Sequence, residues 1–215
     1  MALVVVVDYG MGNLRSVEKA LIHLGTNDEI KVSSNPDDIE QADKIVFPGQ
    51  GAMPDCMKEL KARELVEPIR LASTNKPFLG ICIGLQLLYQ RSQEGDVAGL
   101  GLMPGEVVKF SPDHGDSRGE KYKVPHMGWN KVDVCANHPI FDGIGREEYF
   151  YFVHSYFVKP VDSQSIIGKT NYCVPFTSAV ALKNIVAVQF HPEKSQQAGL
   201  RVLTNFLNWD GVWSG

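Results

Sequence analysis

The sequence lacks the features of several protein classes, and each absence excludes something. The apolar run near the N-terminus, 3–7, follows no basic residue and stops at Asp8. The run is too short for a signal sequence or a membrane span. No block of like charges occurs, and the formal net charge is -4, whereas a general nucleic-acid surface needs a basic face. We therefore expect neither a membrane nor a nucleic acid as partner.

Cysteine is scarce, and no C-x-x-C pair occurs among Cys56, Cys82, Cys135 and Cys173. This scatter fits reduced thiols better than a disulfide framework or a zinc site, so we expect a cytoplasmic protein without metal or cofactor. Repeats, low-complexity segments and an evident linker are also missing. With 215 residues and 44% hydrophobic composition, the chain is expected to form a single domain over 1–215.

The first half alternates strand and helix patterns. Apolar strands are predicted at 2–8, 29–34, 43–49 and 77–81. Helices are predicted at 14–25, where leucine and valine recur at helical spacing, and from Pro54 to about Ala72. Apolar strands separated by helices predict a parallel sheet covered on both faces.

The second half is richer in short β segments broken by Gly, Pro and Asn. Strands are predicted at 106–110, 131–136, 148–158, 165–172 and 184–190. A last helix, capped by Ser195, follows. The expected fold class is α/β, with a mostly parallel central sheet, flanking helices and an antiparallel β extension. Residues 111–121 are the best candidate for a mobile loop.

The stretch FLGICIGLQLLYQ (78–90) places Cys82 between two glycines, where a strand over 78–83 gives way to a helix beginning around Leu85. The G-x-C-x-G spacing matches a nucleophile elbow with sulfur in place of oxygen. A helix N-terminus beneath it would favour a thiolate. A cysteine that simply fills the core is the alternative.

A base for such a thiol is available in VAVQFHPEKS (186–195), at the end of another predicted strand. In extended chain, positions i and i+2 point the same way. Glu193 could therefore hold one nitrogen of His191 while the other faces Cys82, the arrangement of nucleophile, base and orienting group. The alternative is a surface histidine before a proline-initiated helix.

The third fragment is FPGQGAMPD (47–55). Gly49 and Gly51 tolerate unusual backbone dihedrals, so an amide of this loop, together with that of Ile83, could form an oxyanion hole. A simple turn is the alternative. All three fragments lie at predicted strand ends, where α/β sheets bind ligands.

The segments PGQGA, GICIGLQ and FHPEKS, in this order, resemble the class I (triad) glutamine amidotransferases. DYGMGNLRSV (8–17), PHMGWN (125–130) and YFVHSY (151–156) are similar to the glutaminase subunits of imidazole glycerol phosphate synthases. The resemblance extends from Val4 to Leu207. Departures are Gln50, where the family commonly has valine, and Ile83 and Leu85 around Gly84, where it usually has leucine and methionine.

The resemblance implies a glutaminase with a Cys-His-Glu triad. It would hydrolyse L-glutamine through a cysteinyl thioester and deliver ammonia to a cyclase subunit in a heterodimer of histidine biosynthesis, forming imidazole glycerol phosphate and AICAR. The implied residues are the nucleophile Cys82, the base His191 and its orienter Glu193; Gly51 and Ile83 at the oxyanion; Gln86, Ser155 and Tyr156 at the glutamine; and Asn13, Met127, Trp129, Asn130 and Lys194 at the synthase partner.

Other interpretations stay open on the sequence. The same chemistry could serve a pyridoxal phosphate, anthranilate or GMP synthase. A standalone cysteine hydrolase acting on γ-glutamyl compounds or peptides would need no partner, and a non-catalytic regulatory module could share the fold. Met127 and Trp129 could be core residues, and His126 and His154 could be structural histidines.

Overall fold

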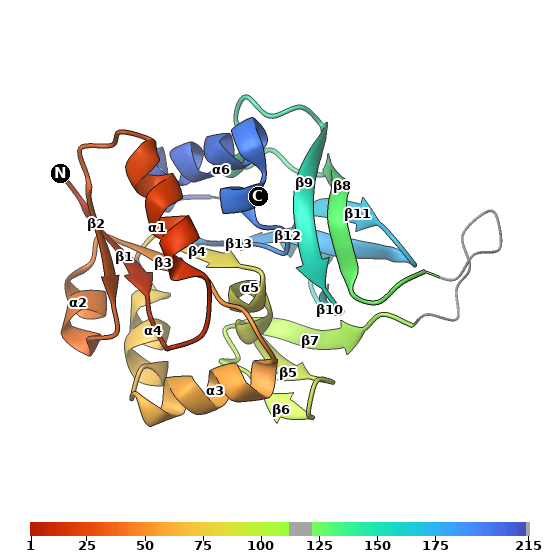
Figure 1. Cartoon of the computed structure of the whole chain (residues 1–215), viewed down its shortest axis with the longest axis horizontal. Coiled ribbons are helices and arrows are strands. Elements are labelled where there is room, and N and C mark those ends of the chain that lie inside the picture. Colours follow the sequence, from red (N-terminus) through yellow and green to blue (C-terminus); the bar gives the residue numbers. More distant parts are fainter. Residues whose placement is uncertain (112–121, 214–215) are drawn as a thin grey trace.

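The computed structural model describes residues 1–111 and 122–213 and shows an α/β protein built on one extended sheet (Figure 1). Five neighbouring strands run parallel, in the order β2, β1, β3, β4, β13. Their bounds are β1 Leu3–Val7, β2 Glu29–Ser33, β3 Lys44–Phe47, β4 Phe78–Ile81 and β13 Ile185–Val188. The last strand of the chain thus lies beside β4, which precedes Cys82.

Helices cover both faces of these strands (Figure 1). They are α1 Leu14–His23, α2 Pro36–Gln41, α3 Met53–Ala62, α4 Val66–Ala72, α5 Ile83–Leu87 and α6 Gln196–Asn208. Val4 and Val6 of β1 belong to a core shared with α1 and α6, whereas Val5 and Val7 belong to a second core shared with α2, α3 and α4. Successive side chains of a strand face opposite sides, so a strand covered on both faces is apolar throughout.

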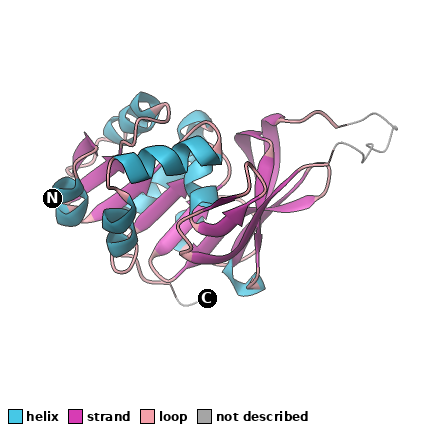
Figure 2. Ribbon diagram, turned by 90° about the horizontal axis from the view of Figure 1, so that it is seen from below, coloured by secondary structure: helices cyan, strands magenta, loops and turns pink. Residues whose placement is uncertain are grey.

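The remaining strands form the antiparallel extension, which Figure 2 shows at the end of the molecule away from most helices. They are β5 Tyr89–Ser92, β6 Val97–Ala98, β7 Met103–Lys109, β8 His126–Val134, β9 Glu147–His154, β10 Tyr156–Pro160, β11 Ile166–Asn171 and β12 Pro175–Leu182. Antiparallel pairing of β12 with β13 joins the extension to the parallel strands, while β5 and β7 pair in parallel. The expected fold class is confirmed.

Several expected elements differ from those observed. The helix predicted over 54–72 is broken into α3 and α4, with Glu64 between them at φ +59°. The single strand predicted over 148–158 divides at Ser155, whose carbonyl accepts the Phe110 amide. The helix after Cys82 ends at Leu87, and Tyr89 already begins β5. Ser195 occupies the N-cap position of α6 without capping it, because its hydroxyl donates to the carbonyl of His191 instead.

Two further points concern the mobile loop and the membrane. Of the loop predicted as mobile over 111–121, residues 112–121 lie outside the described part. Within residues 1–111 and 122–213, none of the helices combines the length and the apolar character that crossing a membrane requires.

Candidate active site

Cys82 lies at a sharp turn between β4 and α5, with φ 55° and ψ −108°. A non-glycine residue with positive φ is strained, and here close packing on both sides enforces it. A Cβ on Gly80 would lie 2.9 Å from the Ala187 side chain, and one on Gly84 would lie 1.8 Å from the Phe47 carbonyl oxygen. Gly84 therefore lets α5 approach β3, and Gly80 leaves room on β4 for Ala187 of β13 and for the backbone of α5. The predicted elbow is present in the structure.

His191 and Glu193 lie just beyond β13, next to β4 in the sheet. The His191 Nδ1 is 2.9 Å from Glu193 Oε1, and each side chain is only 2% exposed. The extended-chain argument for this contact is wrong in its geometry: residues Pro192–Lys194 form the short helix η3. A single helical turn brings the carboxylate back to the imidazole, so the predicted contact forms by a different route.

The His191 imidazole is electrostatically tied to Cys82. Burial by itself lowers the pKa of His191 by penalising the cation. The Cys82 sulfur and then the Glu193 carboxylate outweigh this effect and raise the pKa to about 10. The Nε2 atom has no hydrogen-bond partner among the described residues. A histidine whose pKa is raised in this way is protonated at neutral pH and can deliver its proton within the site.

The sequence analysis missed Gln189, the residue after β13 and two before His191. It is fully buried, its Nε2 lies 3.7 Å from Cys82 Sγ, and its Oε1 accepts from Gln86 Nε2 at 3.2 Å. This side chain therefore links Gln86 to the sulfur through two hydrogen bonds. An isolated glutamine inside an apolar strand, NIVAVQF, was the available signal.

A cavity of about 440 Å³ opens beside the sulfur. Its walls include the catalytic candidates Cys82 and His191, together with Gln50, Gly51, Ile83, Gln86, Glu94, Pro125, Val153, His154, Ser155, Tyr156 and Lys194. Every residue predicted for the oxyanion and for the substrate thus lines one cavity. The volume suits a small molecule, and its lining mixes backbone groups with few charges.

Glu94 is a second residue that the sequence analysis missed. Its Oε2 accepts the Met53 amide at the start of α3 at 2.8 Å, which holds the half-buried carboxylate at the cavity wall. A fixed carboxylate can bind an ammonium group of a ligand. The signal in the sequence was weak, because Glu94 lies in an ordinary-looking turn sequence, SQEGD.

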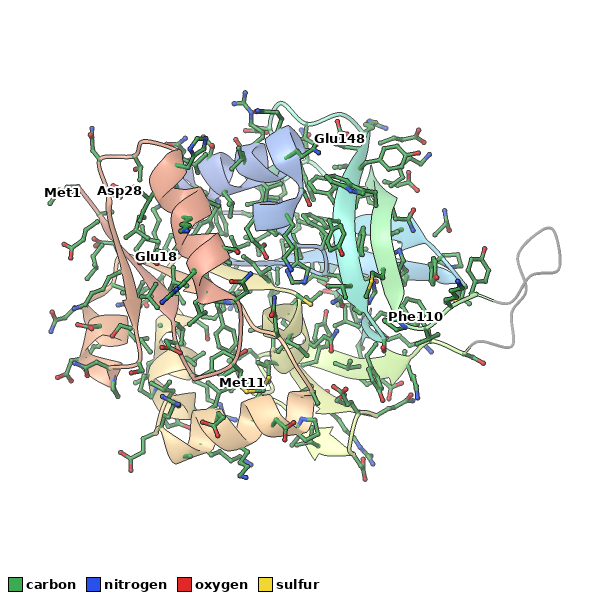
Figure 3. The ribbon with its side chains drawn as sticks, viewed as in Figure 1. Met1, Met11, Glu18, Asp28, Phe110 and Glu148 are labelled. Carbon is green, nitrogen blue, oxygen red and sulfur yellow. The ribbon has the colours of Figure 1, made fainter. Side chains whose placement is uncertain are left out.

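The loop after β3 lies over Tyr9 and beside the loop after β1. A Cβ on Gly49 would lie 1.8 Å from the Tyr9 hydroxyl, and one on Gly51 would lie 2.9 Å from Met11 Cε; Gly51 itself has φ +100°. Met11, labelled in Figure 3, is on the loop between β1 and α1. Gln50, the departure from the family pattern, uses its carbonyl to accept the Cys56 thiol. Glycine is required at both positions, by space at Gly49 and by dihedral angle at Gly51.

The residues expected at a partner are only partly brought together. Met127 and Trp129 are 62% and 47% exposed on one face of β8, which rules out a core role for both. Trp129 packs edge-on against Tyr151, and Lys194 Nζ lies over the same ring. Asn130 is half-buried on the opposite face of β8, and Asn13 is exposed at the start of α1. Lys194 also lines the cavity, so the patch of Trp129, Tyr151 and Lys194 adjoins it.

No group of three or more His, Cys, Asp or Glu side chains suited to a metal ion occurs in the described part of the chain. The site therefore consists of a thiol, an imidazole–carboxylate pair, two buried amides and the cavity they face. Such a set can perform nucleophilic attack, proton transfer and stabilisation of an anion.

Comparison with known proteins gives consistent matches. The family model for Glutamine amidotransferase class-I matches residues 5–209. The chain is 56% identical to imidazole glycerol phosphate synthase subunit HisH of Thiobacillus denitrificans, over 96% of this chain and 91% of that protein. It is 54% identical to the subunit HisH of Aromatoleum aromaticum, over 97% of this chain and 99% of that protein.

Two solved structures support the fold alone. The chain resembles the crystal structure of a glutamine amidotransferase with a TM-score of 0.71 and 18% identity, covering 97% of this chain and 99% of that one. It resembles the structure of PurLQS from Thermotoga maritima with a TM-score of 0.68 and 19% identity, again covering 97% of this chain and 99% of that one.

Proposed function

The chain belongs to the class I glutamine amidotransferases, and from this premise we propose that it is the glutaminase subunit of an imidazole glycerol phosphate synthase. It hydrolyses L-glutamine to glutamate and ammonia and passes the ammonia to a cyclase subunit in histidine biosynthesis, where imidazole glycerol phosphate and AICAR form. The observation that carries the chemistry is the Cys82 elbow beside the His191–Glu193 pair in one cavity. The relatives named as subunit HisH, at 50–56% identity, support the pathway.

The reaction begins with attack of the Cys82 thiolate on the side-chain carboxamide carbon of glutamine. The C=O electrons move to oxygen, giving a tetrahedral anion. His191 then donates its Nε2 proton to the departing nitrogen, ammonia leaves, and a γ-glutamyl thioester remains. The neutral imidazole next removes a proton from water, whose oxygen attacks the thioester and releases glutamate. Glu193 keeps Nδ1 protonated and oriented in both steps.

The cavity wall supplies the other interactions of the proposal. The Ile83 amide is the first of α5, and the first amides of a helix have no partner within the helix; with the amide of Gly51 it receives the oxyanion. Gln86 and the backbone of Ser155 and Tyr156 contact the glutamine. The Glu94 carboxylate is placed to bind the α-ammonium group.

The partner is the cyclase subunit, and the two form a heterodimer. Met127 and Trp129, with Asn13 and Lys194, form the contact surface, whereas Asn130, also expected there, lies on the opposite face of β8 and bonds to His126. Exposed aromatic and Met side chains with a polar rim are typical of such surfaces. Because Lys194 belongs to both the patch and the cavity wall, docking covers the side from which ammonia leaves. We place this complex in the cytoplasm.

The test measures glutamate release by the isolated chain, by its complex with the cyclase subunit, and by the complex with cyclase ligand bound. We expect low activity alone and a clear rise on assembly. Ammonia transfer is checked by formation of imidazole glycerol phosphate from glutamine without added ammonium. Full activity of the isolated chain would favour a standalone hydrolase, and the absence of glutamine hydrolysis in every state would refute the glutaminase.

A further inference from the structure

Two buried histidines lie at the cavity: His154 is part of its wall, and His126 contacts His154. His126 begins β8 and His154 ends β9, and the two are opposite each other in the antiparallel ladder. Their Nδ1 and Nε2 atoms are 2.9 Å apart. Burial lowers the pKa of His126 to about 4 and that of His154 to about 3, so both are neutral near pH 7. The surrounding rings are those of Phe110, Phe152, Tyr172 and Phe176. Phe110, labelled in Figure 3, marks where the end of β7 reaches these strands.

The hydrogen bonds of this pair have only one possible direction. His154 Nδ1 lies 2.8 Å from the Tyr156 carbonyl oxygen, which can only accept, so Nδ1 carries the proton. In a neutral imidazole the other nitrogen is then an acceptor. His154 Nε2 therefore accepts from His126 Nδ1, and His126 Nε2 in turn must accept.

The hydrogen bonds at the other end of this series, at Asn130, independently require the same donor-to-acceptor direction. Asn130 Oδ1 accepts the Lys131 amide at 2.8 Å, which fixes the orientation of the side-chain amide. Its Nδ2 then donates to the Asn171 carbonyl at 2.9 Å and to His126 Nε2 at 3.1 Å. A series of hydrogen bonds thus runs from Asn130 through His126 and His154 to the Tyr156 carbonyl, and every donor in it meets an acceptor.

The Tyr156 carbonyl connects these hydrogen bonds to the active site. It also accepts from Gln86 Nε2 at 3.0 Å, and the second N–H of Gln86 goes to Gln189 Oε1. Gln189 Nε2 faces the Cys82 sulfur. Both donors of Gln86 are thus used. Its Oε1 is buried and has no partner among the described residues, and the residue lines the cavity. The orientation of this acceptor therefore depends on where the Tyr156 carbonyl lies.

We propose that His126 and His154 are positioning residues for the substrate. The hydrogen bonds that run from Asn130 through the two histidines fix the Tyr156 carbonyl. The carbonyl in turn fixes the Gln86 amide, so that Gln86 Oε1 faces the glutamine. This inference rests on the proposed glutaminase function. Burying two imidazoles costs more than burying two apolar side chains of similar size, whereas a fully satisfied polar network fixes a unique geometry. The pair therefore serves the geometry of the pocket rather than the stability of the extension.

Two substitutions at His154 separate positioning from packing. In His154→Asn the amide nitrogen replaces Nδ1, so the donor to Tyr156 is kept and the bond to His126 is lost. In His154→Gln the amide reaches the Nε2 position, so the bond to His126 is kept and the donor to Tyr156 is lost. Each variant removes the ring and one hydrogen bond, so thermal unfolding should shift by similar amounts in the two.

The complex with the cyclase subunit is assayed for glutamate release. We expect His154→Gln to raise the KM for glutamine about tenfold, the effect of one lost hydrogen bond, with kcat within about twofold, since ground-state and transition-state binding fall together. His154→Asn should stay within about threefold of wild type in KM. Equal KM values in the two variants, changed or unchanged, would overturn the proposal and leave a packing role.

A second pair of variants, at His126, keeps the proposal testable if the His154 variants fail to fold. His126→Asn keeps the donor to His154 and should leave the KM near that of wild type. His126→Gln removes the bond that His154→Asn also removes, so its KM should match that of His154→Asn, within about threefold of wild type, and exceed that of His126→Asn. A KM for His126→Gln as high as that of His154→Gln, or no higher than that of His126→Asn, would overturn the proposal. Calorimetric binding of glutamine to these variants in a Cys82→Ala background requires no turnover. If wild-type complex released no glutamate but bound glutamine, the proposed function would fail while the ranking of binding constants would still decide the inference.

Discussion

At the scale of the residue, the active site depends on the imidazole of His191, whose pKa is lowered by burial and raised by Cys82 and Glu193. The raised pKa of His191 has a definite sign for stability. A folded-state pKa of about 10 against an ordinary 6.5 means that the proton stabilises the fold fully below pH 6.5, and that this contribution is lost as the pH rises through 10. The imidazolium is a property of the assembled site, because burial alone would favour the neutral ring.

The first prediction follows from the order of these effects. Cys82→Ala removes the larger of the two side-chain influences that outweigh burial, so the pKa of His191 should fall from about 10 towards its ordinary value. Nitrogen chemical shifts of the His191 imidazole, followed by NMR across pH, measure it. An unchanged pKa in Cys82→Ala would show that Glu193 alone holds the proton.

A second prediction concerns the two partners of Cys82. His191→Ala removes both the acid and the base and should lower kcat by about 10⁴-fold, near the upper limit for acid–base catalysis. Glu193→Gln keeps the shape but loses the control of tautomer and orientation. It should cost less, about 10²-fold, the lower end of the range for acid–base catalysis. Steady-state glutamate release by the complex measures both. If Glu193→Gln were fully active, the triad would reduce to a Cys–His pair.

At the scale of the element, the turn between β4 and α5 works only because its glycines have no side chains. We predict that Gly84→Ala, whose Cβ would lie 1.8 Å from the Phe47 carbonyl, displaces α5 and costs about 1–3 kcal/mol of unfolding free energy. It should also lower kcat/KM, because the Ile83 amide moves with the helix. Denaturant unfolding and glutaminase assays measure these effects.

The matched control for this prediction is Gly145→Ala. A Cβ there would meet only the Glu147 carbonyl, at 3.9 Å, and Gly145 does not have positive φ. Its stability should therefore stay within about 0.5 kcal/mol of wild type, as for ordinary surface changes. Similar losses in the two variants would contradict the steric account of the elbow.

A helix or strand can be predicted from the sequence when the pattern that indicates it lies within that element. The strands β1, β3, β4 and β13 are apolar runs that are recognisable alone, and G-x-C-x-G marks the elbow. The break at Glu64 carries no glycine and depends on Leu65 being buried in the core. Asn35, Pro36 and two aspartates do signal α2, but the helix is too short for a periodic pattern.

The candidate site shows the same division. The His191–Glu193 contact was predictable as a pair, yet its short helix was not, because i,i+2 spacing fits either geometry. Gln189 and Glu94 became visible only in three dimensions: one depends on β13 lying beside β4, and the other on the amide at the start of α3. The donor-to-acceptor direction of the hydrogen bonds between Asn130, His126 and His154 likewise could be assigned only from distances between atoms of β8 and β9.

At the scale of the whole molecule, the exposed face of β8 belongs to a surface that continues past Tyr151 and Lys194 to the mouth of the cavity. Met127 and Trp129 alternate with inward-facing residues of the strand, so they can be changed without disturbing the hydrogen-bonded histidines behind them. Under the two proposals, one face of β8 serves the partner and the other serves the pocket. This separation makes association and catalysis testable one at a time.

The last prediction uses that separation. Trp129→Ala should leave the unfolding free energy of the isolated chain within about 0.5 kcal/mol, as expected for an exposed residue. It should weaken binding to the cyclase subunit by about 10- to 100-fold, since large aromatic side chains carry much of the binding energy at interfaces. Calorimetric titration gives the Kd. At saturating cyclase the glutaminase rate should recover, because the site residues are untouched.

Thr204→Ala on α6, far along the chain from this face, serves as the control and should bind normally. Unchanged affinity in Trp129→Ala would move the interface away from β8, and failure to recover at saturation would mean that Trp129 also transmits activation.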